Sequence, residues 1–389
     1  MENNKITDDI VYIGVDDKTI DLFESQYVVP NGVSYNSYLI KDDKYVVMDT
    51  VDSRGTDGWL SNLESALDGH DVDYLVIHHL EPDHSSSIGI LCDKYPNMKL
   101  VGNAKTFAFL PQFFSINNIQ DRMVLVNEGD EISFGKHTLK FIMAPMVHWP
   151  EVMFSYDITD KALFSADAFG KFGALDTDEE WACEARRYYF NIVGKYGVQV
   201  QAVLKKASNI DIKIICPLHG PILNENLDYY LSLYDTWSSY RAETDGVFIA
   251  FASIHGNTAK VAYRLKEILE EKGANKVAIS DLAREDFAEA IEDAFRYDKI
   301  VLAASSYNAK VFPPMENLLV HLKDKNYQNK KIGIIENGTW APSAAKTMLE
   351  IIDGMKNIEI VEPKITIKTK MKEEDEKLLE ELADNILNN

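Results

Sequence analysis

Two kinds of sequence pattern meet near residue 245 of this 389-residue chain. Up to about residue 222, short runs of β-branched and aromatic residues alternate with turns, as in Tyr45–Met48, Tyr74–Ile77 and Ala162–Ser165. Helical segments such as the one around residues 56–68 lie between these runs. This mixture is typical of sheets covered by helices. The chain is also long enough for more than one hydrophobic core.

The second pattern is a regular alternation of strands and helices. A buried strand is expected over Gly246–Ala252, and a helix with one apolar face over Thr258–Lys272. Further strands are expected over residues 299–305, 331–336 and 364–368. Such an alternation indicates a doubly wound parallel sheet, so the fold class is α/β. We therefore expect two domains, over residues 1–243 and 246–389.

The composition narrows the range of partners and compartments. The formal net charge is -22, and such a surface repels phosphate backbones and anionic lipids, so neither nucleic acid nor a membrane is expected as a partner. The three cysteines form no C-x-x-C pair, which fits a reducing compartment. The N-terminus has no apolar signal segment, and no apolar run approaches about 18 residues. A cytoplasmic protein is expected.

The stretch from His79 to His84 offers four potential metal ligands within six residues. It reads His-Leu-Glu-Pro-Asp-His and directly follows a buried-looking strand. Pro82 stiffens this loop because its ring fixes φ, and rigid supports are typical of metal ligands. Three further candidates each follow another apolar run, at a point where strand ends can meet at one rim of a sheet. The predicted ligands are His79, Glu81, Asp83, His84, His148, Asp167 and His219.

Seven ligands are too many for one four-coordinate ion, and they suit two ions that share a carboxylate. We assign His79, Glu81 and His148 to one ion and Asp83, His84 and His219 to the other, with Asp167 as the bridge. Each ion then keeps an open position. Imidazole and carboxylate ligands without thiolate permit iron and do not exclude zinc. The histidines expected to be ordinary hydrogen-bonded residues are His70, His78, His137 and His321.

A second candidate site lies in the half after residue 245. Residues 253–258 join the first strand of that half to a helix N-terminus, where free N–H groups and the helix dipole favour a phosphate group. The absence of a P-loop lysine and of G-x-G-x-x-G argues against a nucleoside triphosphate and against NAD. Two later loops place Tyr307 and Trp340 where they can flank a flat ring, and FMN is the usual ligand of such a sheet. For either aromatic residue alone, the alternative is a packed loop side chain.

Gly256 allows the first of these loops to turn sharply or to approach the ligand closely. The predicted FMN-binding residues are Ser253, Ile254, His255, Gly256, Asn257, Thr258, Ser305, Ser306, Tyr307, Asn308, Ala309, Asn337, Gly338, Thr339 and Trp340.

Taken together, these motifs resemble the flavodiiron proteins, also called A-type flavoproteins. The resemblance rests on the H-x-E-x-D-H stretch, MVHWP around His148, FSADAFG around Asp167, LHG around His219, and SYNSYL near the start. It covers almost the whole chain. In other proteins of the metallo-β-lactamase-like fold the first motif normally reads H-x-H-x-D-H, so Glu81 marks the di-iron branch.

The resemblance implies a metallo-β-lactamase-like αββα sandwich with two iron ions, followed by a flavodoxin-like domain with FMN. It implies reduction of dioxygen to water or of nitric oxide to nitrous oxide, with electrons from rubredoxin or a similar donor; some relatives use a reduced deazaflavin. It also implies a head-to-tail homodimer or a dimer of dimers. Two alternatives stay open: a zinc hydrolase of the same sandwich fold, and a non-catalytic redox carrier or gas sensor.

Two further residues are candidates for catalysis because of the resemblance. Where many relatives have a histidine beside the irons, this chain has Glu24, which can help to supply protons or tune the choice of gas. Tyr189, next to Tyr188, lies in a region that often approaches the site in relatives. The usual donor is often acidic, so this acidic chain requires a neutral or basic docking surface, which the sequence does not locate.

Overall fold

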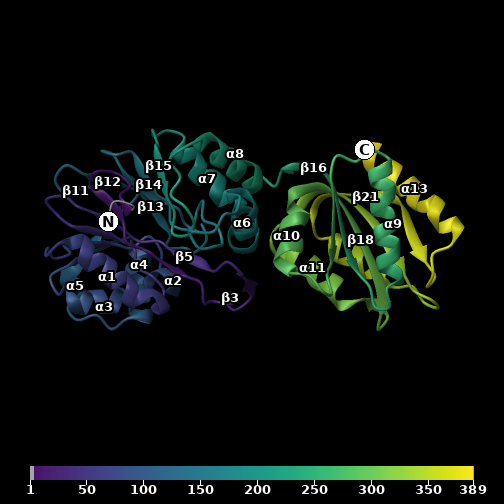
Figure 1. Ribbon diagram of the computed structural model, residues 1–389, viewed down its shortest axis with the longest axis horizontal. Coiled ribbons are helices and arrows are strands. Elements are labelled where there is room, and N and C mark those ends of the chain that lie inside the picture. The colour runs from purple at the N-terminus through teal and green to yellow at the C-terminus, as the bar shows by residue number, and fades with distance from the viewer. Residues whose placement is uncertain (1–3, 389) are drawn as a thin grey trace. The chain divides into compact units, whose positions relative to one another are not determined.

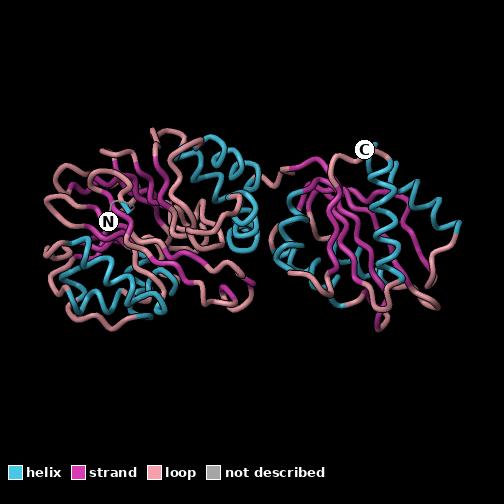
Figure 2. The backbone as a smooth tube through the Cα atoms, in the orientation of Figure 1, coloured by secondary structure: helices cyan, strands magenta, loops and turns pink. Residues whose placement is uncertain are grey.

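The computed structural model describes residues 4–388 and divides into two compact units (Figure 1). The first unit extends to Tyr189 and resumes over Val198–Asp235. The second comprises Phe190–Gly197 and the chain from Thr236 onward. Both units contain sheets with helices beside them, as Figure 2 shows in magenta and cyan. Within residues 4–388, no helix combines the length and the hydropathy needed to cross a membrane.

The first unit is a sandwich built from two sheets. The first sheet has the strand order β1-β6-β7-β8-β9-β10, and β7 to β10 are parallel. Its strands are β1 (Ile10–Tyr12), β6 (Tyr38–Ile40), β7 (Val46–Met48), β8 (Tyr74–Val76), β9 (Lys99–Gly102) and β10 (Met123–Leu125). Because the parallel strands share a direction, their carboxyl ends lie at one edge of the sheet.

The second sheet of this unit has the order β11-β12-β13-β14-β15. Neighbouring strands are antiparallel except for β14 and β15, so β12, β14 and β15 all run in the same direction. Its strands are β11 (Glu131–Ser133), β12 (Thr138–Met143), β13 (Met153–Asp157), β14 (Ala162–Phe164) and β15 (Ile214–Cys216). Two small hairpins pair β2 (Val15–Asp17) with β5 (Val33–Tyr35) and β3 (Leu22–Phe23) with β4 (Tyr27–Val28).

Helices lie on both outer sides of this sandwich (Figure 1). On the side of the first sheet they are α1 (Thr56–Leu67), α2 (Pro82–Ser85), α3 (Ile88–Lys94), α4 (Ala104–Phe113) and α5 (Ile119–Arg122). On the side of the second sheet they are α6 (Trp181–Tyr188), α7 (Gly197–Ala207) and α8 (Leu227–Ser238). An apolar cluster lies between the sheets, with Met48 and Val76 from one sheet and Phe141 and Phe164 from the other. The predicted αββα sandwich is confirmed.

The second unit contains a parallel sheet in the order β17-β16-β18-β20-β21. This is the 2-1-3-4-5 order of flavodoxin-like folds, so the predicted doubly wound sheet is confirmed. The strands are β16 (Thr244–Ala252), β17 (Val277–Asp281), β18 (Tyr297–Tyr307), β20 (Gln328–Asn337) and β21 (Lys356–Ile367), with the short β19 (Lys310–Val311) antiparallel to β18. The sequence did not predict the edge strand β17, whose residues are mostly half-buried.

Five helices cover the two faces of this sheet. On one face lie α9 (Asn257–Glu271) and α13 (Glu373–Asn388), whose apolar sides join the buried cluster of β16, β18 and β21. On the other lie α10 (Phe287–Arg296), α11 (Pro313–Asp324) and α12 (Ala344–Ile352) (Figure 1). Val261, Leu265 and Ile268 of α9 are fully buried, as the helical spacing predicts. The loops at the carboxyl ends of the strands are thereby left free to form a site.

Candidate metal centre and cofactor pocket

The first candidate ligands lie just beyond the carboxyl end of β8. His79 follows the strand, Glu81 immediately precedes α2, and Asp83 and His84 belong to that short helix. Pro82 occupies the first helical position, where a missing N–H sacrifices no helical hydrogen bond. The backbone N–H of His84 donates to the Glu81 carbonyl at 2.9 Å and closes the turn. Several polar side chains are thereby held within one short loop.

The remaining candidate ligands come from three other strand ends. His148, Asp167 and His219 follow β12, β14 and β15, which run in one direction. The loops after β14 and β15 are joined by a hydrogen bond from Leu218 N to Ala166 O at 2.9 Å. Asn36, within the SYNSYL stretch, donates from its side chain to the carbonyls of Pro217 and Gly220, both at 2.8 Å. The structure thus brings all seven predicted ligands to one edge of the sandwich.

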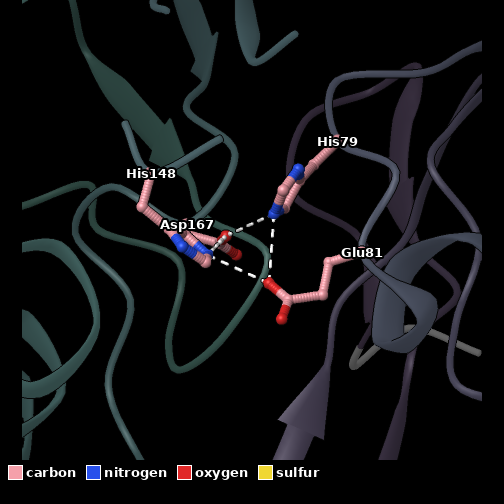
Figure 3. A group of neighbouring side chains, drawn as sticks. All are labelled: His79, Glu81, His148 and Asp167. Atoms are coloured by element: carbon pink, nitrogen blue, oxygen red, sulfur yellow. Dashed lines mark hydrogen bonds and ion pairs between the residues drawn. The ribbon is translucent and has the colours of Figure 1, made fainter. Parts of the chain in front are cut away.

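Four of these side chains converge on one point (Figure 3). The Nε2 atoms of His79 and His148 lie 3.2 and 3.0 Å from Glu81 Oε2. The same two nitrogens lie 3.3 and 3.2 Å from Asp167 Oδ2. Two imidazole nitrogens and two carboxylate oxygens therefore face one another across a space of the size that one metal ion fills.

The other three candidate ligands form a second group beside the first. His84 Nε2 and His219 Nε2 are 3.1 Å apart, and each lies 3.2 Å from Asp83 Oδ2. The second carboxylate oxygen of Asp167, Oδ1, lies 3.1 Å from His84 Nε2 and 3.8 Å from His219 Nε2. Asp167 therefore directs one oxygen toward each group, which is the geometry of a carboxylate between two cations.

The donor atoms themselves indicate what the cluster holds. Asp167 is 1% exposed and Asp83 9% exposed, yet none of their carboxylate oxygens forms a well-directed hydrogen bond within residues 4–388. Such buried, unsatisfied carboxylates are costly unless a cation binds them. Four imidazoles, two in each group, lie close to these carboxylates, and no thiolate lies in either group. The residues present therefore fit two metal ions of the kind that nitrogen and oxygen ligands prefer.

Charge pairing also shapes the protonation of the cluster. Burial lowers the pKa of His148, but the carboxylates of Asp167 and Glu81 outweigh burial and raise this pKa to about 9. The same competition raises the pKa of His79 and holds that of Asp167 well below its usual range. The cluster is thus built to hold positive charge, and metal cations supply that charge when they displace the ring protons.

Two of the imidazoles are oriented through their other nitrogen. His79 Nδ1 lies 2.8 Å from Glu151 Oε1, and the same oxygen accepts from Leu80 N at 3.0 Å. His219 Nδ1 donates to the carbonyl of Ser34 at 2.7 Å. Both contacts turn Nε2 toward the cluster, as is typical of metal-bound histidine. Glu151 is not among the predicted residues, and its nearness to His148 along the chain was the only signal for it.

A hairpin of β3 and β4 lies over the second group. The ring of Phe23 meets that of His219 edge-on at 5.4 Å between centroids, and Glu24 and Ser25 at the tip have φ of 48° and 58°. Glu24 is exposed overall, but its carboxyl group hydrogen-bonds to that of Glu81. Desolvation and the charge of Glu81 raise the pKa of Glu24 to about 7. Gln26 Nε2 donates to the same carboxyl at 3.1 Å.

The two candidate tyrosines differ in their surroundings. The ring of Tyr188 lies 5.4 Å from that of His219, and burial, together with nearby carboxylates, raises the pKa of Tyr188 well above its usual value. The ring of Tyr189 lies 5.2 Å from that of Tyr234, and Tyr189 is fully buried. Of the pair, Tyr188 is the one that the structure places against a candidate ligand.

The predicted FMN-binding loops surround a pocket of about 530 Å³ at the carboxyl end of the second unit's sheet. This volume lies within the range of small-molecule and cofactor sites. Besides the predicted residues, Ala341, Ser343 and Thr369 line the pocket. Thr369 belongs to the loop after β21, and no local pattern in the sequence signals its contribution. Gly256 is not itself in the lining; with φ of 84° it forms the turn that opens α9.

Hydroxyl groups lie where this pocket meets the N-terminus of α9. Thr258 Oγ1 lies 2.9 Å from Ser305 Oγ, and Gly256 N donates to Ser253 Oγ at 3.1 Å. The lining residues include no Asp, Glu, Lys or Arg. The N-terminus of α9 and neutral donors are features that suit an anion. The aromatic side chains of Tyr307 and Trp340 also line the pocket.

The other histidines have partners that account for them. His78 contacts Asp49 through Nδ1 at 2.5 Å and Ser155 through Nε2 at 2.7 Å. The ring of His70 stacks on Tyr45, and His321 contacts the Asn317 carbonyl. His137, Asp157 and Asp160 form a third His-carboxylate group in the described part of the chain. It lies at the amino end of β12 and the carboxyl end of the antiparallel β13, which is the opposite edge of the sheet from His148.

Comparisons with known proteins agree with the folds of both units. The family model described as ODP family beta lactamase matches residues 33–220, and a flavodoxin domain model matches residues 248–375. An anaerobic nitric oxide reductase flavorubredoxin of Vibrio vulnificus is 28% identical over 348 residues, which cover 86% of this chain and 70% of the relative.

Solved structures match over nearly the full length. The flavodiiron protein from Giardia intestinalis has a TM-score of 0.91 and 25% identity, and the match covers 99% of this chain and 97% of that chain. The rubredoxin oxygen:oxidoreductase from Desulfovibrio gigas has the same fold, with a TM-score of 0.90 and 24% identity over 99% of this chain and 97% of that chain.

The cofactors follow from these matches and from the two sites. The flavodoxin domain and its pocket identify FMN as one cofactor. The other is a di-iron centre, which the paired His-carboxylate groups fit. Because both domains, both cofactor sites and the full-length fold agree, this chain belongs to the flavodiiron proteins, a family of oxidoreductases.

Proposed function

We propose that the chain passes electrons from a donor through FMN to the di-iron centre and there reduces dioxygen to water, nitric oxide to nitrous oxide, or both. The observation that carries this proposal is the position of Asp167, whose two carboxylate oxygens each face a separate group of imidazole and carboxylate ligands. Two ferrous ions and a reduced flavin together hold the four electrons that dioxygen requires. Adjacent cations can also stabilise charge that develops on a bound gas molecule.

In the proposed assignment, His79, Glu81 and His148 hold one iron and Asp83, His84 and His219 hold the other, with Asp167 between them. Glu151 and the Ser34 carbonyl fix the orientation of His79 and His219. These contacts keep the Nε2 atoms aimed inward before any cation binds, which reduces the reorganisation that binding requires.

We assign a proton-handling role to Glu24 and a supporting role to the tyrosines. With a pKa of about 7, the Glu24 carboxyl can hold a proton beside Glu81 and release it near neutral pH. Phe23 and Tyr188 pack against the His219 ring and limit the access of water to that side. A role for Tyr189 stays a prediction, and its hydroxyl is the atom that would act.

The FMN-binding role of the loops after β16, β18 and β20 is likewise a proposal. The N-terminus of α9 with Ser253 and Thr258 would hold the phosphate, and Tyr307 and Trp340 would flank the ring system. The proposed donor is rubredoxin or a similar carrier, and the proposed assembly is a head-to-tail homodimer or a dimer of dimers. The functional domains are proposed over residues 1–243 and 246–389. The compact units of the structure differ slightly from these bounds, because the second unit begins at Thr236 and also includes Phe190–Gly197.

The test is a gas-electrode assay of the purified full-length protein with reduced rubredoxin, run separately with dioxygen and with nitric oxide. Iron, zinc and flavin contents are measured on the same sample. Rapid consumption of either gas, with about two irons and one FMN per chain, supports the proposal. Zinc alone together with esterase or phosphodiesterase activity would replace it with a hydrolase. Full iron and flavin without turnover of either gas would leave a carrier or sensor instead.

A further inference from the structure

We infer that a lysine rim beside the FMN pocket, defined as Lys310, Lys368 and Lys370, is the docking surface for a small acidic electron-carrier protein. The inference rests on the proposed function, because it names the surface on which the electron donor binds. It concerns the second unit alone and uses only the loops at the carboxyl edge of that unit's sheet.

Charge is distributed unevenly along this edge. At the β17 end of the sheet, the loop over residues 281–286 contains Asp281, Glu285 and Asp286 against Arg284. The loops after β16 and β20 contain no Asp, Glu, Lys or Arg. At the β21 end, residues 368–372 read Lys-Thr-Lys-Met-Lys. The edge therefore changes from acidic to basic along the strand order β17-β16-β18-β20-β21, although the whole chain has a net charge of -22.

The lysines lie directly beside the pocket. Lys368 and Lys370 flank Thr369, which lines the pocket, and both are exposed. Asn337 fixes this loop, because its side chain accepts from Thr369 N and donates to Thr369 O, both at 3.0 Å. Lys310 is exposed at the start of β19, and Ala309, which precedes it, also lines the pocket. The basic charge is therefore held at the rim by ordered backbone.

These charges are available to a partner. Within residues 4–388, neither Lys368 nor Lys370 has a carboxylate within 4 Å, and Lys310 has only Glu316 at 3.9 Å. In the acidic first turn of α13, Glu374 pairs with Lys372 at 3.9 Å and Glu376 with Arg264 at 2.6 Å, while Glu373 is exposed. Asp375 is buried. The rim thus presents two unpaired lysines, and a third with one distant carboxylate, on a chain whose net charge is -22.

The surface between these lysines has the character of a protein interface. Trp340 is 90% exposed, Tyr307 45% and Ile254 37%, and all three line the mouth of the FMN pocket. Exposed aromatic side chains inside a charged rim are typical of protein–protein contacts. A small anionic coenzyme would instead need a concave site that encloses most of its surface. The net charge repels an acidic carrier elsewhere, so the basic rim also steers its approach.

The electron count fits a one-electron carrier. Each reduced carrier molecule loses one electron and leaves oxidised. Two successive docking events supply the two electrons that, with two protons from solvent, reduce the flavin fully. Docking beside the pocket shortens the path between the carrier's redox centre and the flavin.

The test compares two charge-reversal variants of the full-length holoprotein. Lys368→Glu/Lys370→Glu reverses the charge of two of the three rim lysines, and Lys276→Glu/Lys356→Glu makes the same change of four charges at the opposite, amino edge of the same sheet. The control lysines are also exposed and have no carboxylate within 4 Å in the described chain. Stopped-flow absorbance records the second-order rate constant for flavin reduction by a purified acidic rubredoxin at low and high salt.

We expect the rim variant to lose about 10-fold or more in this rate constant at low salt, and the control variant to lose much less. At about 0.5 M salt the difference should shrink, because charges are screened. FMN content and the rate of flavin reduction by reduced riboflavin, which carries no phosphate, should be equal in both variants. Equal losses in the two variants, or no loss in the rim variant, would overturn the inference.

Two further measurements separate the remaining possibilities. The rim variant is also reduced with free reduced FMN, a small anion, and with reduced riboflavin, which lacks the phosphate. If the variant loses rate with reduced FMN, relative to riboflavin, as strongly as it does with rubredoxin, the rim recognises a small anion. The protein-docking inference is then wrong. If rubredoxin fails to reduce even the unaltered protein, while a reduced free flavin still drives gas consumption, the docking inference fails and the proposed reductase function stands.

Discussion

At the residue scale, Asp167 is the side chain on which both metal positions depend. Its two oxygens face different ligand groups, so Asp167→Asn, which keeps the shape and removes the charge, should weaken both positions. We expect iron to fall below one ion per chain and turnover to drop by about 100-fold or more. Metal analysis of the purified variant checks this, with the exposed Asp211→Asn as the control. Normal iron content would reject the bridging role.

Glu151 should affect metal affinity without being a ligand. It holds His79 through Nδ1 and also accepts from Leu80 N, so Glu151→Gln keeps hydrogen-bonding capacity and loses the charge that makes the imidazole a better ligand. We expect iron affinity to fall by about 10- to 100-fold. Competition with a chelator measures this loss. The flavin content should stay at its normal level, and a parallel loss of flavin would indicate general unfolding instead.

Glu24 is the residue at which proton supply can be tested. Glu24→Gln removes the group that holds a proton beside Glu81, so turnover should fall by up to about 100-fold with iron unchanged. Glu24→His returns a titratable group of the type that many relatives have. It should restore much of the rate and change the ratio of nitric oxide to dioxygen turnover, as gas electrodes can record. Full activity in Glu24→Gln would contradict the role.

At the scale of elements, the turn that opens α9 connects backbone conformation to FMN binding. Gly256 has φ of 84°, and a Cβ there would meet no atom within 4 Å, so Gly256→Val adds backbone strain of about 1–2 kcal/mol without a steric clash. Because the strained turn forms the phosphate end of the pocket, FMN affinity should fall while iron content stays normal. Fluorescence titration of released FMN measures this.

The same helix offers a matched control. Gly273, just beyond the carboxyl end of α9, has φ of 86° and equally open surroundings. Gly273→Val should therefore cause a similar loss of thermal stability and leave the FMN affinity unchanged. If both variants lost FMN equally, general destabilisation rather than the phosphate turn would be the cause.

At the opposite edge of the first unit, His137 fastens the start of β1 to β12 and β13. Its Nδ1 lies 3.0 Å from Asp157 Oδ2 and its Nε2 3.2 Å from Asp9 Oδ2. Burial lowers the pKa of His137, but the carboxylates raise it to about 9. Because the folded state holds this proton more tightly than the unfolded state, the contribution to stability is full below about pH 6.5 and is lost as the pH rises through 9.

His137→Gln should consequently lower the free energy of unfolding by about 1–2 kcal/mol at pH 6 and by little at pH 10. The expected loss at pH 6 is kept small because Asp9 is partly exposed and solvent screens its charge. Calorimetry of the variant and the unaltered protein at both pH values checks the sign. A larger cost at pH 10 than at pH 6 would show that His137 is not held as a cation.

At the scale of the whole molecule, local pattern was enough to predict the two-domain fold class. The strands of both units are apolar runs, and the candidate ligands follow those runs directly, so both could be found along the chain. Glu151, Ser343 and Thr369 could not, because they reach their sites through tertiary packing and belong to no periodic pattern. The edge strand β17 was missed because its alternation is weak. Phe190–Gly197 joins the second unit only through long-range contacts.

The chemistry-bearing loops of the first unit all leave one edge of its sandwich, and the His137 cluster ties down the other. Substitutions in those loops can change the surroundings of the metal centre while the opposite edge continues to hold β1 against β12 and β13. Homologues with different preferences can therefore share one framework, and engineering of this enzyme class can be confined to one rim of the molecule.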